Sequence, residues 1–147
     1  MTESERLIAE ARAAAENSYS PYSRFRVGAV VVADDGSAYA GCNVENAAYG
    51  ASICAEANAI TTAAAHGVRV VDTVAVTCLD GEGCTPCGNC RQLMREFAVK
   101  RVILTTEDGT PVEYELEDLL PHSFGPDDLS SGVAELAEEP TPESRLL

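Results

Sequence analysis

Three cysteines and one glutamate in this chain have the types and the spacing of a hydrolytic metal site. Cys54 lies two residues before Glu56, and a Cys-x-x-Cys pair, Cys87 and Cys90, follows 33 positions after Cys54. Three thiolates can hold a zinc ion and leave its fourth position open to water. Glu56 could then take a proton from that water and later protonate a leaving amine. The spacing therefore predicts a catalytic zinc site.

A fourth cysteine leaves a second interpretation open. Cys84 precedes Cys87 at the same x-x spacing, so a non-enzymatic module with a structural zinc held by four cysteines is the alternative. Pro86 disfavours it, because proline suits the entry to a helix better than a zinc knuckle. Cys42 and Cys78 lie in apolar, strand-like stretches and are interpreted as core residues.

Two predicted helices begin at the candidate ligands. An alanine-rich stretch predicts a helix over 52–66 with Cys54 near its start, and a further helix begins near Cys87. Helix starts offer free N–H groups and a partial positive charge, and both stabilise thiolates. Cys87 and Cys90 are one turn apart and therefore point the same way. The two helices can bring their thiols to one metal ion if both pack on the same sheet.

The remaining pattern predicts that sheet. A capping box, Thr2 with Glu5, opens a helix over about 3–17. Five apolar runs are typical of strands and cover 27–33, 37–43, 70–78, 101–106 and 112–116. Strands separated by helices need crossover connections, which cover both faces of a sheet. We therefore expect an α/β fold, a three-layer α/β/α domain with a five-stranded mixed sheet.

The charge of the chain narrows the class of substrate. The 147 residues include 24 acids and 10 bases, which gives a formal net charge of −14. Such a surface repels phosphate backbones, whereas proteins that grip polynucleotides present basic stripes. We therefore expect no nucleic acid and no membrane as partners, and a neutral small molecule as the substrate.

Location and domain extent follow from the distribution of apolar and acidic residues. No stretch reaches the roughly 18 to 20 apolar residues of a membrane span, and the N-terminus lacks the apolar run of a signal peptide. We therefore expect a cytoplasmic protein. Residues 1–129 are predicted to form the catalytic domain, and residues 130–147, acidic and proline-bearing, a mobile tail.

Nearly the whole chain except the tail resembles the small zinc-dependent cytidine deaminases. The matching stretches are SPYSRFRVGA (20–29), GCNVENAAYG (41–50), CAE (54–56), PCGNCRQLMREF (86–97) and LLPHSFGPDDL (119–129). Cys-x-Glu with Pro-Cys-x-x-Cys is also the general signature of zinc deaminases. The resemblance implies one zinc ion per subunit and hydrolytic deamination of cytidine, and of 2′-deoxycytidine, to uridine products and ammonia in pyrimidine salvage.

The same resemblance implies a homotetramer with active sites completed by neighbouring subunits. The residues to which it assigns substrate contacts are Phe25, Asn43, Glu45, Tyr49, Ala55 and Phe124. Asn43 and Glu45 would bind the ribose hydroxyls, and Phe25 would pack against the substrate. Tyr49 and Phe124 would reach the pockets of adjoining subunits. Without the resemblance, turn chemistry for the two polar residues and core packing for the phenylalanines are the simpler interpretations.

One position departs from the family pattern. Many members with three cysteine ligands have arginine directly after the glutamate, where this chain has Ala57. Three thiolates leave the zinc site negatively charged, which weakens zinc as a Lewis acid. We hypothesise that helix-start N–H groups, or Arg91 beside Cys90, offset this charge. The departure also leaves a deaminase of a modified nucleoside or nucleoside antibiotic, similar to blasticidin S deaminase, as an alternative.

Overall fold

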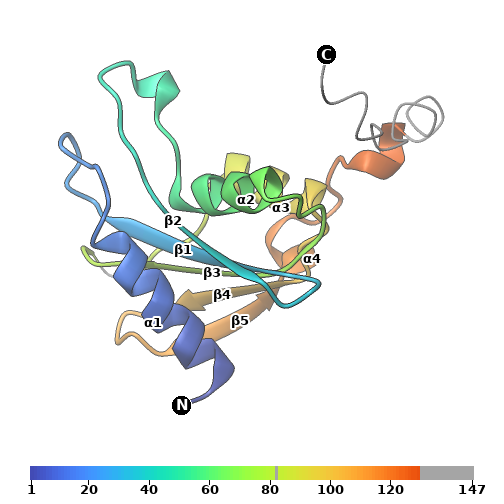
Figure 1. The fold of residues 1–147 in the computed structure, drawn as a ribbon, viewed down its shortest axis with the longest axis horizontal. Helices are drawn as coiled ribbons and strands as arrows, with labels where there is room; N and C mark the ends of the chain where they lie inside the picture. Colours follow the sequence, from blue (N-terminus) through green and yellow to red (C-terminus); the bar gives the residue numbers. More distant parts are fainter. Residues whose placement is uncertain (82, 130–147) are drawn as a thin grey trace.

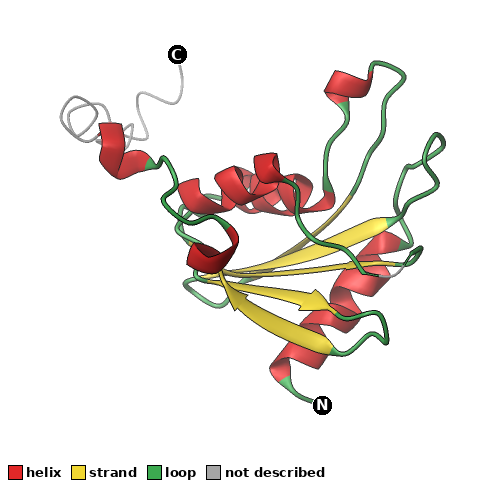
Figure 2. Ribbon diagram, turned by 180° about the vertical axis from the view of Figure 1, so that it is seen from behind, coloured by secondary structure: helices red, strands yellow, loops and turns green. Residues whose placement is uncertain are grey.

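A five-stranded sheet in the order β2-β1-β3-β4-β5 forms the centre of the computed structural model, which describes residues 1–81 and 83–129 (Figures 1 and 2). The strands are β1 (Val27–Ala33), β2 (Ala38–Cys42), β3 (Val71–Cys78), β4 (Arg101–Thr105) and β5 (Pro111–Glu115). Neighbours β3 and β4 run parallel, and the other three described pairs run antiparallel. The predicted mixed sheet is confirmed.

Helices lie on both faces of this sheet (Figure 1). They are α1 (Glu3–Ala15), α2 (Ala55–Ala65), α3 (Gly88–Glu96) and the short α4 (Leu116–Leu119), with two 3-10 turns at Tyr49–Ala51 and Pro126–Leu129. Helix α1 covers one face, and α2 and α3 cover the other. The predicted three-layer α/β/α arrangement is therefore also confirmed.

Successive residues of strand β1 pack against the helices on opposite faces of the sheet. Ala29 and Val31 pack in the core cluster that contains α2 and α3, whereas Val30 packs with Leu7 and Ile8 of α1. This follows because successive strand residues point to opposite faces. All three β1 residues are at most 1% exposed.

Two glycines let the helices approach the sheet closely. A Cβ at Gly28 would overlap the backbone of Ala11 in α1. A Cβ at Gly41 would overlap the amide of Ala59 and lie 2.8 Å from the carbonyl oxygen of Ala55 in α2. The absence of a side chain at Gly41 therefore sets how closely α2, which begins at the candidate site, packs on β2.

The start of α2 differs from the prediction. The predicted helix begins at residue 52, but Val44 and Ile53 form an antiparallel bridge, with N···O distances of 2.9 and 2.8 Å. Extended pairing at Ile53 is incompatible with helical backbone, so the helix begins only at Ala55 and Cys54 becomes its N-cap. The capping box predicted for α1 is present, and that helix ends at Ala15 rather than 17.

The predicted tail, residues 130–147, lies outside the described residues. Across residues 1–81 and 83–129, none of the helices combines the length and the apolar character that crossing a membrane requires.

Candidate metal centre

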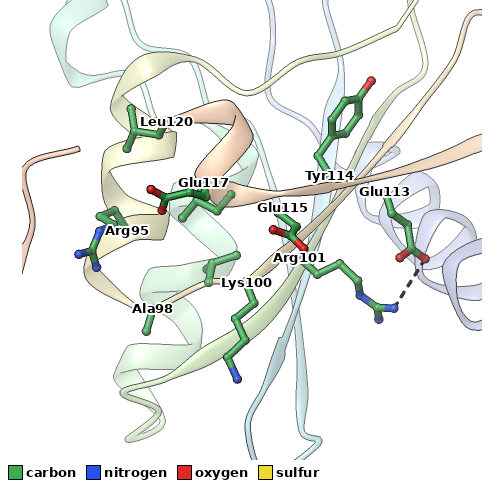
Figure 3. A pocket seen from close by; sticks show the side chains of 11 residues that line it. Arg95, Ala98, Lys100, Arg101, Glu113, Tyr114, Glu115, Glu117 and Leu120 are labelled. Carbon is green, nitrogen blue, oxygen red and sulfur yellow. Dashed lines mark ion pairs between the residues drawn. The ribbon is translucent and has the colours of Figure 1, made fainter. Parts of the chain in front are cut away.

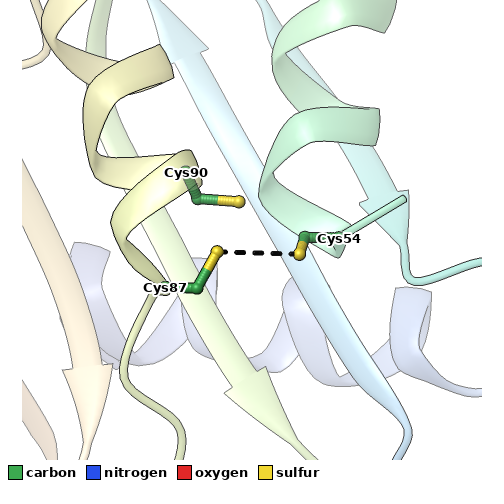
Figure 4. A group of neighbouring side chains, drawn as sticks. All are labelled: Cys54, Cys87 and Cys90. Atoms are coloured by element: carbon green, nitrogen blue, oxygen red, sulfur yellow. Dashed lines mark hydrogen bonds between the residues drawn. The ribbon is translucent and has the colours of Figure 1, made fainter. Parts of the chain in front are cut away.

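The starts of α2 and α3 bring three cysteines together. Cys54 is the N-cap of α2, Cys87 is the N-cap of α3, and Cys90 lies in the first turn of α3. Their sulfur atoms lie within 4.8 Å of one another and point into a common space (Figure 4). The Sγ atoms of Cys54 and Cys87 are 3.9 Å apart. Two thiolates bound tetrahedrally to zinc at about 2.3 Å lie about 3.8 Å apart, so this donor set fits a zinc ion.

Cys84 is not a member of this group. Within the described residues, the sulfur atoms that could share one ion are those of Cys54, Cys87 and Cys90. The pKa of the half-buried Cys84 thiol is raised to about 12, chiefly by burial and also by the nearby Glu56 and Cys78. The geometry therefore favours an open site with three ligands over a closed site with four.

Hydrogen bonds within the group favour ionisation of one member. The pKa of Cys54 is lowered to about 6, chiefly because the Cys90 thiol donates to its sulfur and also because Cys87 does. The same interaction, together with burial and the charge of Glu56, raises the pKa of Cys90. The group thus shares protons among its sulfurs, and a bound cation would replace them.

Glu56 lies in the first turn of α2, and only 4% of its surface is exposed. The pKa of its carboxyl is raised to about 7, chiefly by burial and also by the negative charge of Cys54. An acid at a helix start is more commonly exposed and ionised. A buried carboxyl that titrates near neutrality beside three thiols has instead the properties of a proton carrier.

Asn43 uses its side chain to join three segments. Its Oδ1 accepts hydrogen bonds from the backbone N–H of Val27, at 2.9 Å, and from the hydroxyl of Ser18. Its Nδ2 donates to the carbonyl oxygen of Phe25 at 2.8 Å. The N–H of Cys42, the residue before Asn43, donates a hydrogen bond to Oδ1 of Asn58 in α2 at 3.0 Å. Asn43 is therefore held firmly beside the loop 18–26.

Glu45 holds the same loop. One carboxylate oxygen accepts hydrogen bonds from the N–H groups of Tyr22 and Ser23, at 3.0 and 3.1 Å. Hydrogen bonds from Ser23 and then Tyr22 keep the pKa of Glu45 below its usual value. Phe25, at the end of this loop, is 37% exposed and lies against Gly81 of the β3–α3 loop. In a single chain, Asn43 and Glu45 thus organise the loop that carries Phe25, and their contact with ribose stays a prediction.

The other predicted substrate contacts lie in different surroundings. Tyr49 is 75% exposed, and its ring meets that of Tyr22 edge to face, with centroids 5.9 Å apart. Phe124 is also exposed, whereas Ala55 is fully buried as the first residue of α2. The segments 44–53 and 121–129 both extend away from the sheet on the side of α2 and α3 (Figure 1). Tyr49 and Phe124 are thus both exposed, and their contact with the pockets of adjoining subunits stays a prediction.

The hydrogen bonds of Arg91 go to backbone carbonyl groups, and its predicted role in offsetting the thiolate charge stays a hypothesis. Its Nε donates to the carbonyl oxygen of Pro86 at 2.8 Å, and its Nη1 donates to that of Leu119 at 2.7 Å. Neither bond reaches a thiol, although Pro86 directly precedes the ligand Cys87. Through these two hydrogen bonds the Arg91 guanidinium links the turn before α3 to the end of α4.

Sequence reasoning did not find one ion pair near the site. The carboxylate of Asp80 accepts from the backbone N–H and the Nε of Arg26, both at 3.0 Å, and from its Nη2 at 3.2 Å. This joins the β3–α3 loop to the residue after Phe25. An aspartate after a strand is an ordinary turn residue, so no local signal identifies a partner 54 positions away.

A cavity of about 660 Å³ lies elsewhere, between the end of α3, α4 and the strands β4 and β5 (Figure 3). Arg95, Tyr114 and Leu120 are among its lining residues, and an ion pair between Arg101 and Glu113, at 3.6 Å, lies at one side. Its lining includes neither the cysteines of the metal centre nor any predicted substrate contact.

Known proteins share both the sequence and the fold. The family model of the cytidine and deoxycytidylate deaminase zinc-binding region matches residues 1–106. The chain is 46% identical over 129 residues to a cytidine deaminase of Sporosarcina psychrophila, covering 86% of this chain and 94% of that protein. It is 42% identical over 125 residues to one of Mycobacterium tuberculosis, covering 84% and 90%. The crystal structure of a cytidine deaminase from Burkholderia pseudomallei superimposes with a TM-score of 0.77 at 43% identity, covering 84% of this chain and 100% of that one.

Proposed function

Because the chain belongs to the cytidine and deoxycytidylate deaminase family, we propose that it hydrolyses cytidine, and also 2′-deoxycytidine, to the uridine products and ammonia. The observation that carries this proposal is the buried carboxyl of Glu56 beside three thiols that fit a zinc ion. The relatives with 42 to 46% identity are cytidine deaminases, which supports cytidine as the substrate. The reaction would serve pyrimidine salvage in the cytoplasm.

Cys54, Cys87 and Cys90 would hold one zinc ion per subunit. When bound, zinc supplies Lewis-acid chemistry that makes water a nucleophile at neutral pH. Glu56 takes a proton from the attacking water and delivers it to the ring nitrogen next to C4. It then takes the remaining proton from the hydroxyl on C4 and transfers it to the amine, so that the C4–N bond breaks, a C4 carbonyl forms and ammonia leaves. With a pKa of about 7, both protonation states of this carboxyl are populated near neutrality, so each transfer starts from an available state.

The substrate is a neutral nucleoside rather than a polynucleotide. A formal charge of −14 disfavours phosphate-bearing ligands. We assign the ribose hydroxyls to Asn43 and Glu45 and the base to Phe25, supported by the hydrogen bonds that hold all three on one loop system. The family description also names deoxycytidylate, and a direct comparison of cytidine with its 5′-phosphate separates the two substrate classes.

We further propose a homotetramer in which Tyr49 and Phe124 complete the pockets of neighbours. Exposed aromatic rings on two extended segments support this assembly. The outward side of α2 supports it as well, because the single charged residue of that helix, Glu56, is buried. An uncharged helix face is unusual on a chain of such net charge and favours burial against another subunit. Light scattering of the zinc-loaded protein would measure the assembly directly.

The decisive experiment is an absorbance assay on cytidine with the wild type and Glu56→Gln. We expect the variant to bind zinc normally and to lose about 10²- to 10⁴-fold in kcat, because the amide cannot carry protons. A pure, zinc-loaded wild type without turnover would contradict the proposal. Because Ala57 stands where many family members have arginine, a nucleoside antibiotic such as blasticidin S should be assayed beside cytidine. If the protein deaminates the antibiotic faster than cytidine, the antibiotic is the better substrate assignment.

A further inference from the structure

Helix α3, which carries two of the candidate metal ligands at its start, also holds the segment that contains Phe124. The Nε2 of Gln92 donates a hydrogen bond to the carbonyl oxygen of Phe124 at 2.8 Å. Arg95, nearly one turn further along α3, forms an ion pair with Asp127 at 3.6 Å. Side chains of one helix thus anchor the chain on both sides of Gly125.

Gly125 shows how closely this segment fits α3. It is buried, and a Cβ at this position would lie 2.8 Å from the Cζ of Arg95. Asp128 closes a turn on it: the N–H of Gly125 donates to the Asp128 carboxylate at 2.7 Å, and the N–H of Asp128 donates to the Gly125 carbonyl at 3.0 Å. The backbone that follows Phe124 is therefore fixed by local and helix contacts together.

Phe124 itself, in contrast, is 59% exposed. A backbone that is anchored while its aromatic side chain faces outward is the arrangement expected for a ring that is presented to another molecule. Gln92 is itself exposed and lies two residues after Cys90 on the same helix. Its hydrogen bond is the direct link between the helix of the metal centre and the Phe124 residue.

We propose that Gln92 is a positioning residue that sets the place of the Phe124 ring over the substrate pocket of a neighbouring subunit, a proposal that rests on the function and assembly proposed above. Gln92 touches neither substrate nor metal in this scheme. It acts through the carbonyl of Phe124, with Arg95 holding the following turn. Its loss therefore weakens substrate binding and leaves the chemical step and the zinc site intact.

Steady-state kinetics on cytidine test this proposal. We expect Gln92→Met to raise KM by about two- to tenfold, the value of one exposed hydrogen bond, with kcat and zinc content nearly unchanged. Gln92→Glu keeps the length but loses the donor and should behave in the same way. Glu96→Met is the matched control, because Glu96 is exposed at the end of α3 and has no partner in the described part of the chain. An unchanged KM in both Gln92 variants would overturn the proposal.

A double-mutant cycle shows whether Gln92 acts through Phe124. In a Phe124→Ala background, Gln92→Met should have no further effect on KM, since the ring that it positions is gone. Additive effects of the two substitutions would overturn the proposal and indicate a separate, structural role for Gln92.

Fluorescence provides a readout that does not depend on catalysis. The chain contains no tryptophan, so Phe124→Trp introduces a single reporter. We expect Gln92→Met in that background to lower the steady-state anisotropy of the tryptophan, and Glu96→Met to leave it unchanged. Unchanged anisotropy with Gln92→Met would overturn the positioning role. An inactive wild type would instead overturn the proposed function, and the anisotropy result would still decide whether Gln92 holds the segment.

Discussion

The Sγ atoms of Cys54 and Cys87 lie 3.9 Å apart, although the two residues are 33 positions apart and cap different helices. Both helices pack on the same face of the sheet, so the fold itself brings the two caps together. The separation matches that of two thiolates on a tetrahedral zinc ion. This relationship and the burial of Glu56 carry the proposed function.

Substitution of single cysteines should show which of them bind zinc and which do not. We expect Cys54→Ser and Cys87→Ser to lower bound zinc from about one ion per chain to near none, because a two-thiol site lacks a ligand. Cys84→Ser should leave the content at one, since Cys84 lies outside the group. Elemental analysis of the purified proteins measures this. Loss of zinc from Cys84→Ser would instead support the closed site with four cysteine ligands.

The ion pair between Asp80 and Arg26 should stabilise the folded state in a pH-dependent way, and Asp80→Asn should remove this stabilisation. Hydrogen bonds from the Arg26 side chain, and then from its backbone N–H, lower the pKa of Asp80 below its ordinary value of 3.8. A lowered pKa means that the carboxylate stabilises the folded state fully above that ordinary value and loses this effect as the pH falls through the lowered one. Wild type should therefore have a higher Tm than Asp80→Asn at pH 6, and the two should converge as the pH falls through the lowered pKa.

Thermal unfolding with Arg26→Gln provides the control for this pair, because it removes the partner and leaves Asp80 in place. The two single variants should show the same direction of change at pH 6. A difference in Tm between wild type and Asp80→Asn that stays as large in strong acid as at pH 6 would show that packing, rather than charge, holds the loop.

Substitution of Arg91 distinguishes a geometric role from a charge role. Arg91 donates to the carbonyl groups of Pro86 and Leu119, so Arg91→Ala should lower the free energy of unfolding by about 1.5 to 3 kcal/mol and weaken zinc binding. Arg91→Lys keeps the positive charge but cannot make both bonds, and we expect it to rescue neither property. Chelator competition and denaturant unfolding provide the measurements. Full rescue of zinc affinity by lysine would indicate that the charge offsets the thiolates.

Gly41→Ala should disturb the metal centre from a distance. A Cβ at Gly41 would collide with the backbone of Ala59 and Ala55, which pushes α2 away from β2. We expect a loss of about 1 to 3 kcal/mol of stability, typical of overpacking, together with lower zinc affinity because Cys54 caps this helix. Gly50→Ala is the control, since a Cβ there meets no atom within 4 Å among the described residues. Equal effects of the two substitutions would contradict the packing explanation.

Local patterns determined much of this molecule. Val27–Ala33 was predicted to the residue as a strand, because a valine-rich run ends at an Asp-Asp-Gly turn. The Thr2–Glu5 capping box formed as predicted, since its hydrogen bonds span only three residues. The candidate ligands and Glu56 were also recognisable, because a Cys-x-x-Cys pair and a Cys-x-Glu pair are patterns of neighbouring residues.

Tertiary structure decided what depends on segments far apart in the chain. The bridge between Val44 and Ile53 moved the start of α2 to Ala55. The burial that raises the pKa of Glu56 comes from packing of α2 on the sheet, and the carbonyl partners of Arg91 lie in other segments. Sequence thus determined which groups could do the chemistry, because residue type and short spacing are local. Only the fold determined which groups meet, because burial and long-range hydrogen bonds arise when distant segments pack together.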